Sequence, residues 1–168
     1  MKEMAKKYDV IIIGAGVSGL YTLYKVRQLG LSARVFEAGT DIGGTWYWNR
    51  YPGARFDSES YSYEYSFSKE LGTEWEWSEH FAGQPEVERY LHHVAEKFDL
   101  RRDIQLNARI ASSIYDELNN CWEIQTEDAQ QAFGKYLVCA TGLLSAYQLP
   151  PYEGVNSFKG QSLHSAPW

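Results

Sequence analysis

The sequence predicts an α/β fold in which a parallel β-sheet carries an inserted antiparallel β-meander. Three observations predict it. A β-branched run at residues 8–13 stops at a glycine, as a buried parallel strand does. A helical pattern and a second strand follow within about 30 residues, which makes one βαβ unit with an expected right-handed crossover. Short strand patterns then alternate with turns between residues 104 and 140. With 168 residues, the chain fits a single domain.

The first βαβ unit is expected over residues 8–37. The strand at 8–13 precedes a helix over 17–29, in which apolar residues recur every three positions. Gly30 stands just past that helix, where a C-cap glycine belongs. The run at 33–37 restores strand character and completes the unit.

The middle of the chain is expected to be irregular and then helical. Residues 38–83 lose their periodicity and are rich in Gly, Pro, Asn, Ser and aromatic residues, and long irregular segments usually carry function. A helix pattern opens at Gln84-Pro85 and runs to residue 98 with one apolar face. His92 and His93 are neighbours within it and cannot share a face, so we interpret them as surface or boundary residues and not as metal ligands.

The last third of the chain should form the meander and the final core strand. Strand patterns occur at residues 104–106, 108–115, 121–125 and 136–140. We expect the first three to build a small meander inserted before the last core strand, 136–140. Asn119-Asn120 is a hairpin-turn candidate, because asparagine tolerates positive φ. No element is predicted for residues 149–168.

Composition narrows the class of protein. Sixteen Lys and Arg against 22 Asp and Glu give a net charge of −6, which disfavours nucleic acid as a partner. The N-terminus is basic at Lys2, Lys6 and Lys7, but the apolar run after it is too short for a signal peptide or a membrane span, so we expect a soluble, cytoplasmic chain. Cys121 and Cys139 lack metal-type spacing and are expected to be reduced core residues.

A dinucleotide-binding turn is predicted between the first strand and the first helix. Gly14, Gly16 and Gly19 fit the pattern G-x-G-x-x-G, which allows a tight turn, a close approach of backbone to a pyrophosphate, and close packing of helix on strand. The helix N-terminus adds free N–H groups. Glu37 ends the second strand, where a carboxylate can accept hydrogen bonds from a ribose and would repel a 2′-phosphate. The site should therefore hold FAD or NAD and not NADP.

Two longer motifs distinguish FAD from NAD. Residues 44–57, GTWYWNRYPGARFD, agree at every fixed position with G-x-W-x-x-x-x-[FY]-P-G-x-x-x-D, and residues 158–168, FKGQSLHSAPW, agree with F-x-G-x-x-x-H-x-x-x-W. Ala140-Thr141-Gly142 looks like the A-T-G element of flavoproteins that bind two dinucleotides. With these motifs the sequence resembles the Baeyer–Villiger monooxygenases, and the fold it implies is a Rossmann-like FAD-binding domain.

The resemblance implies a set of site residues. Gly14, Gly16, Ser18 and Gly19 would hold the pyrophosphate, and Glu37 the adenosine ribose. Twelve of the 26 aromatic residues lie between Trp46 and Phe81. Aromatic side chains of this segment would line the flavin site. The remaining implied cofactor contacts are Gly44, Thr45, Trp46, Asp57, Tyr63 and Ile110, with Trp48 as a further candidate for the wall. Asp57 and Arg55 are the implied catalytic residues, Asp57 by orienting an arginine; His164 is expected to act between domains more than as an acid or base. No metal is implied.

The resemblance also implies a reaction. Family members bind FAD, reduce it with NADPH and use O2 to turn ketones into esters or lactones, while the protein positions the cofactor and excludes water. A second glycine motif and the catalytic arginine have no counterpart in this chain. We therefore expect residues 1–168 to be the N-terminal part of an FAD-binding domain, without the NADPH-binding domain and the C-terminal FAD segment. On this reading the chain alone is catalytically incomplete, and its partner is the remainder of the enzyme. Two alternatives are an isolated flavin-binding or folding module without activity and a flavin monooxygenase that oxidises nitrogen or sulfur.

Overall fold

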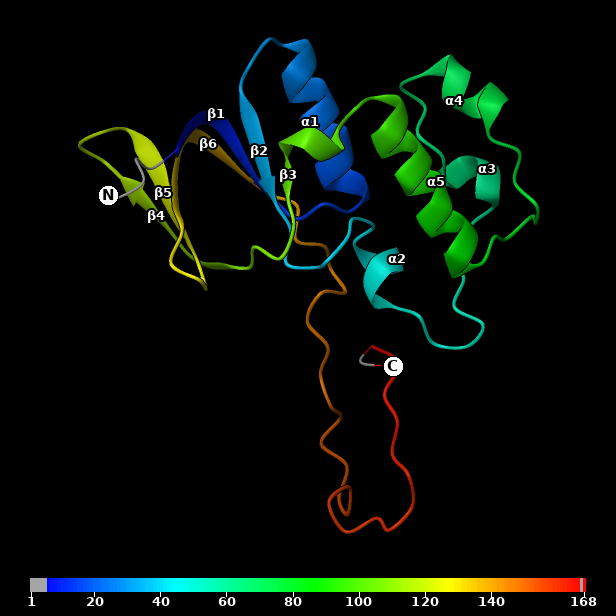
Figure 1. The fold of residues 1–168 in the computed structure, drawn as a ribbon. Helices are drawn as coiled ribbons and strands as arrows, with labels where there is room; N and C mark the ends of the chain where they lie inside the picture. The colour runs from blue at the N-terminus through cyan, green and yellow to red at the C-terminus, as the bar shows by residue number, and fades with distance from the viewer. Residues whose placement is uncertain (1–5, 167) are drawn as a thin grey trace.

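The computed structural model describes residues 6–166 and 168, and it confirms the α/β fold (Figure 1). One sheet holds six strands in the order β3-β2-β1-β6-β5-β4. Neighbours from β3 to β6 are parallel, whereas β6-β5 and β5-β4 are antiparallel. The strands are β1 (Lys6–Ile13), β2 (Ala33–Phe36), β3 (Ile104–Gln105), β4 (Ile110–Asp116), β5 (Cys121–Thr126) and β6 (Gln131–Cys139).

The meander differs from the sequence expectation at both of its ends. The run at residue 104, expected as its first strand, is the parallel edge strand β3 next to β2. The last strand begins at Gln131 and not at residue 136, so the single strand β6 both closes the meander against β5 and pairs with β1 in the core. The expected turn does join β4 to β5, and Asn120 there has φ 52°.

The helices lie on one side of the sheet, with α1 between the sheet and α5 (Figure 1). Both long helices form as predicted, within one or two residues of the expected bounds. The segment expected to be irregular also contains three short helices, so that prediction was incomplete. The helices are α1 (Val17–Gln28), α2 (Thr45–Trp48), α3 (Ser60–Tyr63), α4 (Lys69–Glu74) and α5 (Gln84–Lys97), followed by the 3-10 turn η1 (Arg101–Asp103).

The core is split by the sheet into two apolar clusters. The larger packs α1 and α5 against β1 and β2, through side chains such as Leu23, Leu91 and Val35. The smaller lies on the other face around Ile11 and Ile124. Its small size leaves part of β6 uncovered. Tyr136 and Cys139 are exposed, so the expectation that both cysteines are core residues was wrong for Cys139; Cys121 is half-buried, and both are free.

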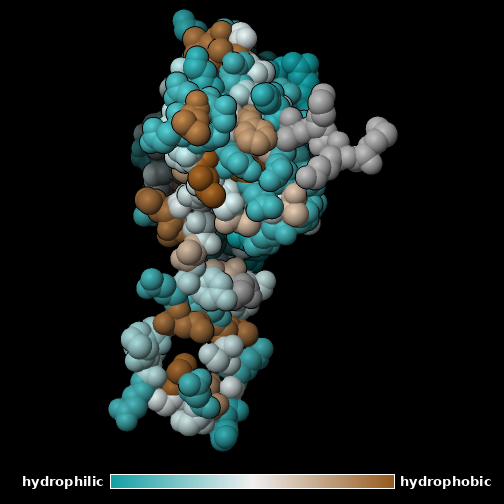
Figure 2. Space-filling model, turned by 90° about the vertical axis from the view of Figure 1, so that its left-hand side faces the viewer, coloured by the Kyte–Doolittle hydropathy of each residue, from teal (hydrophilic) through white to brown (hydrophobic). Residues whose placement is uncertain are grey.

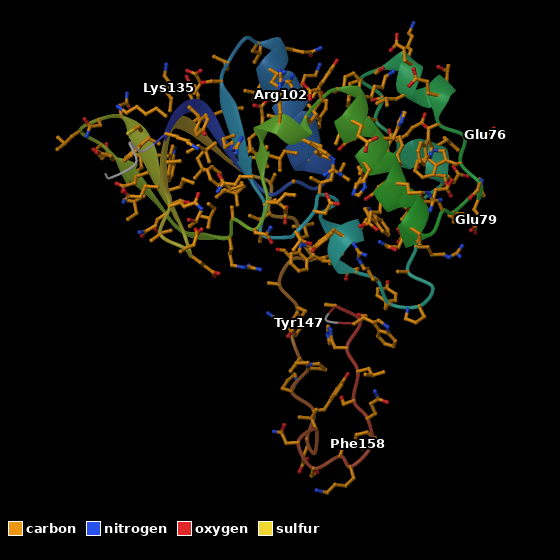
Figure 3. The ribbon with its side chains drawn as sticks, in the orientation of Figure 1. Glu76, Glu79, Arg102, Lys135, Tyr147 and Phe158 are labelled. Carbon is orange, nitrogen blue, oxygen red and sulfur yellow. The ribbon has the colours of Figure 1, made fainter. Side chains whose placement is uncertain are left out.

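The described residues of the segment 141–168 form an extended arm that leaves the end of β6 and turns back toward α2 (Figure 1). Its two legs stand clear of the globular part, with hydrophobic side chains on the visible surface (Figure 2). Tyr147 lies nearer the base of the arm than Phe158 (Figure 3). As expected, residues 149–166 contain no helix or strand. Lys2 of the basic N-terminus lies outside the described residues. No helix among residues 6–166 is long and apolar enough to cross a membrane.

Candidate functional site

The glycine turn after β1 is shaped by close backbone contacts that exclude side chains. Gly14 has φ 102°, and a Cβ there would lie 2.5 Å from the carbonyl oxygen of Ala140. A Cβ on Gly19 would lie 1.9 Å from the carbonyl oxygen of Gly14. Helix α1 therefore begins tightly against the end of β1. Its N-cap, Gly16, has no side chain to cap the first turn, so the N–H groups of that turn have no partner within the helix.

Glu37 braces this turn from the end of β2. Its side chain is 5% exposed, and its Oε2 accepts a hydrogen bond from the backbone N–H of Ala15 at 2.7 Å. The Oε1 atom accepts from the N–H of Gly39 at 2.7 Å. The sequence suggested only a ribose contact, because its pattern does not show which way a carboxylate turns. A carboxylate has about four acceptor positions, so two bonds to backbone leave capacity for sugar hydroxyls.

A second glycine pair packs directly on the dinucleotide turn. The N–H of Gly43 donates to the carbonyl of Ala15 at 3.0 Å. A Cβ on Gly16 would lie 3.2 Å from the Cα of Gly44, and one on Gly44 would lie 2.7 Å from the Cα of Gly16. The start of the 44–57 motif and the G-x-G turn therefore form one wall. Sequence reasoning did not foresee this contact, although consecutive glycines at 43 and 44 are a signal of close backbone approach.

Asp41 fixes the loop that carries Gly43. Its Oδ1 lies 2.8 Å from Nη1 of Arg101 and 2.8 Å from the N–H of Ile42. Its Oδ2 lies 3.7 Å from Nε2 of His92 on α5. Partial burial by itself would raise the pKa of the Asp41 carboxyl, but the hydrogen bonds from Arg101 and Ile42 outweigh it, so the pKa is lowered. The loop beside the glycine turn is thus held by a charged anchor.

The predicted aromatic wall separates into two parts. Trp46, in α2, is buried, and its indole N–H donates to the Tyr63 hydroxyl at 2.8 Å. Phe56 lies edge-on to Trp46 at 5.6 Å and stacks on Tyr63 at 4.5 Å. These three rings belong to the core between α2 and α3. Trp48, by contrast, is 45% exposed and contacts the ring of Tyr47. Thr45 is the first residue of α2.

The two predicted catalytic residues do not pair with one another. The Arg55 guanidinium lies 3.1 Å from a carboxylate oxygen of Glu79 and 3.1 Å from the carbonyl of Phe81. Asp57 is exposed, and among the described residues its carboxylate has no hydrogen bond or ion pair. A side chain in that position is free to receive a cation from elsewhere.

A hollow of about 290 Å³ lies beyond the end of β2. It is lined by Ala38, Asn107, Arg109, Glu127 and Asp128. The sequence offered no other indication of this hollow than that Ala38, one of its lining residues, directly follows Glu37. The predicted contact Ile110 begins β4 next to the hollow and packs with the smaller core cluster. Ser18 is exposed on the first turn of α1.

His164 stands in the arm, apart from these groups in the sequence and in its contacts. Its ring lies 4.9 Å from the ring of Tyr147 on the other leg, and Nδ1 accepts from the N–H of Ala166 at 3.1 Å. Pro167 of the same motif is outside the described residues. Among the described residues, no group of three or more His, Cys, Asp or Glu could hold a metal ion.

The chain is similar in sequence to a known protein family and to several of its characterised members. Residues 5–168 match the family model described as flavin-binding monooxygenase-like. An acetone monooxygenase (methyl acetate-forming) from Gordonia sp. (strain TY-5) is 46% identical over 160 residues, which are 95% of this chain and 30% of that protein. Phenazine N-monooxygenase PhzNO1 from Lysobacter antibioticus is 43% identical, over 96% of this chain and 30% of its own length.

Solved structures agree with these relatives. An oxidized steroid monooxygenase bound to NADP superposes with a TM-score of 0.89 at 48% identity, covering 97% of this chain and 31% of that one. The chain thus spans about a third of the length of the proteins that it matches. Its counterpart in them is a part of a larger polypeptide.

Proposed function

The chain belongs to the flavin-binding monooxygenase-like family, and from this premise we propose that it is the N-terminal, FAD-binding part of a Baeyer–Villiger monooxygenase. The proposed enzyme oxidises ketones to esters or lactones with NADPH and O2. The observation that carries the proposal is the wall made by the G-x-G turn and the 43–44 loop, braced by Glu37. It joins the dinucleotide turn to the longer motif in one site.

The residues of this wall fit an FAD diphosphate and its sugar. The first turn of α1 offers unpartnered N–H groups and the positive end of the helix dipole, which favour a phosphate anion. Gly14, Gly16 and Gly19 keep the surface free of side chains that would stand in its way. Glu37 retains acceptor capacity for ribose hydroxyls, and its charge disfavours a 2′-phosphate. When bound, FAD supplies the redox and oxygen chemistry, and the chain orients it.

The catalytic part of the proposal concerns Asp57 and Arg55. Asp57 is available to orient an arginine donated by polypeptide beyond residue 168, because its carboxylate has no partner among the described residues. Arg55 is held by Glu79 and the Phe81 carbonyl and would act by fixing the loop that carries Asp57. Ser18, Gly44, Thr45, Trp46, Tyr63 and Ile110 remain proposed cofactor contacts.

Further polypeptide would complete the domain. The outer edge of β6 is paired with β5 only at residues 131–134, so the rest of that edge is open in the described structure. Leu143, Leu149 and Phe158 of the arm are among its exposed hydrophobic side chains. The NADPH-binding domain and a returning FAD segment would cover these surfaces, which is consistent with relatives that are far longer than this chain.

Binding of FAD tests the proposal on the chain itself. Gly16→Ala should abolish FAD uptake in a calorimetric titration. The added Cβ would lie 3.2 Å from the Cα of Gly44 and would keep the FAD diphosphate from approaching the backbone. Gly83→Ala is the matched control. Gly83 is the N-cap of the other long helix with nearly the same φ, and its Cβ would meet only ordinary contacts at 3.7 Å. Equal loss of uptake in both variants, or no uptake by the parent chain, would contradict the proposal.

The relative that acts as a phenazine N-monooxygenase supports a second candidate, oxidation of nitrogen. The two candidates share the FAD site and differ in substrate. Assay of the full-length enzyme with NADPH, against a panel of cyclic ketones and of aromatic N-heterocycles, separates them. Ester or lactone formation favours the first candidate, and N-oxide formation favours the second.

A further inference from the structure

A continuous set of aromatic rings fills the space among α1, α2, α3, α4 and α5. Neighbouring ring centroids in it are 4.2–6.3 Å apart. We call this set the aromatic chain. Its members are Trp46, Phe56, Tyr63, Trp77, Trp75, Tyr90, Tyr65, Phe67, Tyr21, Tyr24 and Phe98. Most of these rings can lose an electron reversibly, because they belong to tryptophan or tyrosine.

The aromatic chain begins beside the proposed FAD site. Trp46 follows Gly44 by two residues, and Gly44 packs on Gly16 of the dinucleotide turn. The Trp46 ring is buried, so an electron removed from it cannot be replaced directly by a reductant in solution. Its neighbours Phe56 and Tyr63 extend the contact away from the turn.

The middle of the chain crosses the layer of helices. Phe56 bridges from Trp46 to Trp77, with its centroid 6.1 Å from the Trp77 ring. Trp77 lies 5.1 Å from Tyr90 of α5, and Tyr90 lies 6.1 Å from Tyr65. Phenylalanine does not oxidise readily, so an electron passing between Trp77 and Trp46 must cross the Phe56 ring in one step.

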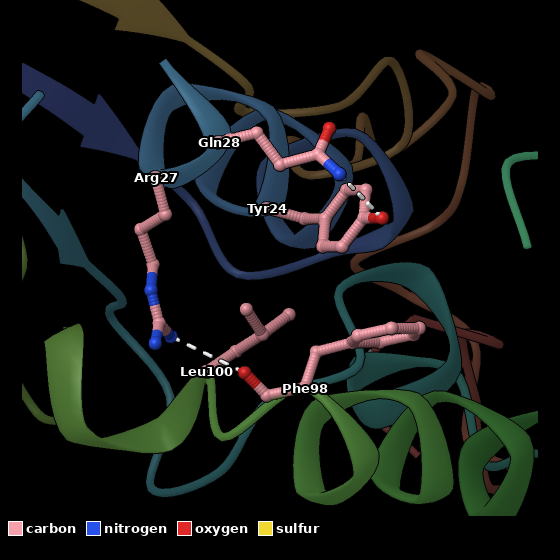
Figure 4. A pocket seen from close by; sticks show the side chains of 5 residues that line it. All are labelled: Tyr24, Arg27, Gln28, Phe98 and Leu100. Atoms are coloured by element: carbon pink, nitrogen blue, oxygen red, sulfur yellow. Dashed lines mark hydrogen bonds between the residues drawn. The ribbon is translucent and has the colours of Figure 1, made fainter. Parts of the chain in front are cut away.

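The aromatic chain reaches the surface at Tyr21 of α1. Tyr65 stacks at 6.3 Å with Tyr21, whose side chain is 40% exposed. On the same route Phe67 stacks on Tyr24 at 4.2 Å, and Tyr24 meets Phe98 edge-on at the rim of a hollow of about 260 Å³ (Figure 4). Tyr21 is the most exposed tyrosine of the aromatic chain, so its hydroxyl is the one best placed to give a proton to water.

Hydrogen bonds and burial set how readily each interior ring holds positive charge or loses a proton. The indole N–H of Trp77 donates to the Glu64 carboxylate at 3.2 Å, which stabilises positive charge on that ring. Burial raises the pKa of Tyr65, and it raises the pKa of Tyr90 to about 12. Both phenols therefore hold their protons more tightly than an exposed tyrosine does. The electron vacancy therefore passes along the aromatic chain until it reaches a ring that can release a proton.

We propose that the aromatic chain from Trp46 to Tyr21 conducts oxidising equivalents from the flavin site to the protein surface. It rests on the proposed function, because that function places an oxidised flavin at this site, and blue light would make that flavin a one-electron oxidant. The excited flavin would take one electron from Trp46 and would keep it as the one-electron-reduced cofactor. Each oxidised ring then takes an electron from the next ring along the aromatic chain. Tyr21, the last of them, loses one electron to its neighbouring ring and its proton to water. A surface reductant, a thiol or ascorbate, then returns a hydrogen atom to the tyrosyl radical.

The first test uses a ruthenium photo-oxidant in place of the flavin to remove an electron from Trp46. Cys121→Ser and Cys139→Ser remove the native thiols, and Trp48→Cys adds one to which a ruthenium polypyridyl label can be attached, two residues from Trp46. A cobalt(III) ammine quencher then converts the photoexcited label to ruthenium(III), which oxidises Trp46. Tyrosyl radicals are followed by transient absorption, and modified residues are located by peptide mass spectrometry. Oxidation is expected at Tyr21.

The structure provides an internal control of equal exposure. Tyr115 is 38% exposed and lies 5.2 Å from Trp122, outside the aromatic chain. Oxidation through solution would modify Tyr21 and Tyr115 alike, whereas conduction modifies Tyr21 alone. Trp77→Phe and Tyr65→Phe should each abolish Tyr21 oxidation while keeping an aromatic ring in place, and urea unfolding checks that both variants fold. Equal modification of Tyr21 and Tyr115, or unchanged oxidation of Tyr21 in both folded variants, would overturn the proposal and leave the rings as packing only.

A second arm separates this proposal from the proposed function. Blue light on the FAD-loaded chain should oxidise Tyr21 in the same way, and Trp77→Phe should prevent it. A parent chain that takes up no FAD contradicts the proposed function, yet the ruthenium experiment still decides whether the path conducts. FAD uptake with no oxidation of Tyr21 from either oxidant overturns the aromatic chain alone.

Discussion

The body of the molecule, residues 6–140, and its arm, residues 141–168, use the same apolar residue types with opposite results. Leu91 in α5 is 1% exposed, whereas Leu149 in the arm is 69% exposed and Leu143 is 99% exposed. In the body, apolar residues recur at helical or strand spacing and meet one another across two layers. In the arm they follow no period, and among its described residues one ring contact, from Tyr147 to His164, joins the two legs. Burial in the body follows from packing against the helices and the sheet, which also covers unpatterned residues such as Phe56 and Leu71, whereas the apolar residues of the arm meet no such surface in the described structure.

The largest expected effect comes from deleting matched leucine side chains in the two regions. Leu91→Ala should lower the free energy of unfolding by about 2–5 kcal/mol, because it leaves a cavity between α5 and α1. Leu149→Ala should change it by less than about 0.5 kcal/mol, because the side chain is already in water. Urea unfolding of both variants measures the difference. A loss for Leu149→Ala as large as that for Leu91→Ala would break the distinction between body and arm.

The same contrast explains how much could be predicted from the sequence. The helices α1 and α5 and the strand β1 were predicted to within about two residues, because a local period encodes the face that each one buries. The parallel pairing of β3 and the early start of β6 at Gln131 were not, because both depend on which distant strand supplies the hydrogen bonds. Strand pairing is a non-local choice that a short apolar run does not specify.

The candidate site was predictable in position and not in contacts. The glycine pattern located the turn, and its close contacts to Ala140 explain why glycine is needed there. The orientation of Glu37 toward Ala15 and the packing of Gly44 on Gly16 could not be inferred, since they arise only when two loops meet. The partner of Arg55 was also unforeseen, because Glu79 is far from it in the sequence.

The brace at Glu37 allows a sharper test within the body. Glu37→Gln should lower the stability of the chain, without any nucleotide, by about 1–3 kcal/mol. The amide keeps one acceptor but turns an NH2 group toward a buried backbone N–H, at Ala15 or at Gly39. Glu76→Gln, at an exposed position, is the control and should be neutral. Thermal unfolding in the absence of FAD measures both, and equal melting temperatures would show that Glu37 serves only the ligand.

The charged anchor at Asp41 predicts a smaller effect that depends on pH. The folded-state pKa of Asp41 is lowered by its hydrogen bonds from Arg101 and Ile42, against the opposing effect of burial. Its stabilisation is therefore present above the ordinary pKa of 3.8 and is lost as the pH falls through the lower, folded-state value. Asp41→Asn should be less stable than the parent at neutral pH, and the gap should close in acid. A difference in stability between the two proteins that stays constant with pH would show that the charge of Asp41 does not cause it.

The smallest expected effect concerns the ring contact between Tyr147 and His164 in the arm. Tyr147→Ala removes the partner of His164, yet both lie in a segment whose burial contributes little, so the free energy of unfolding should change by less than about 0.5 kcal/mol. The same variant should make the arm more open to limited proteolysis, because exposed segments with few packed contacts are cleaved first. Mass spectrometry of the fragments should place new cuts within residues 141–168 and leave the body intact. Cuts that appear in α1 or α5 would mean that the arm supports the body, and the two regions would then have to be treated as one cooperative unit.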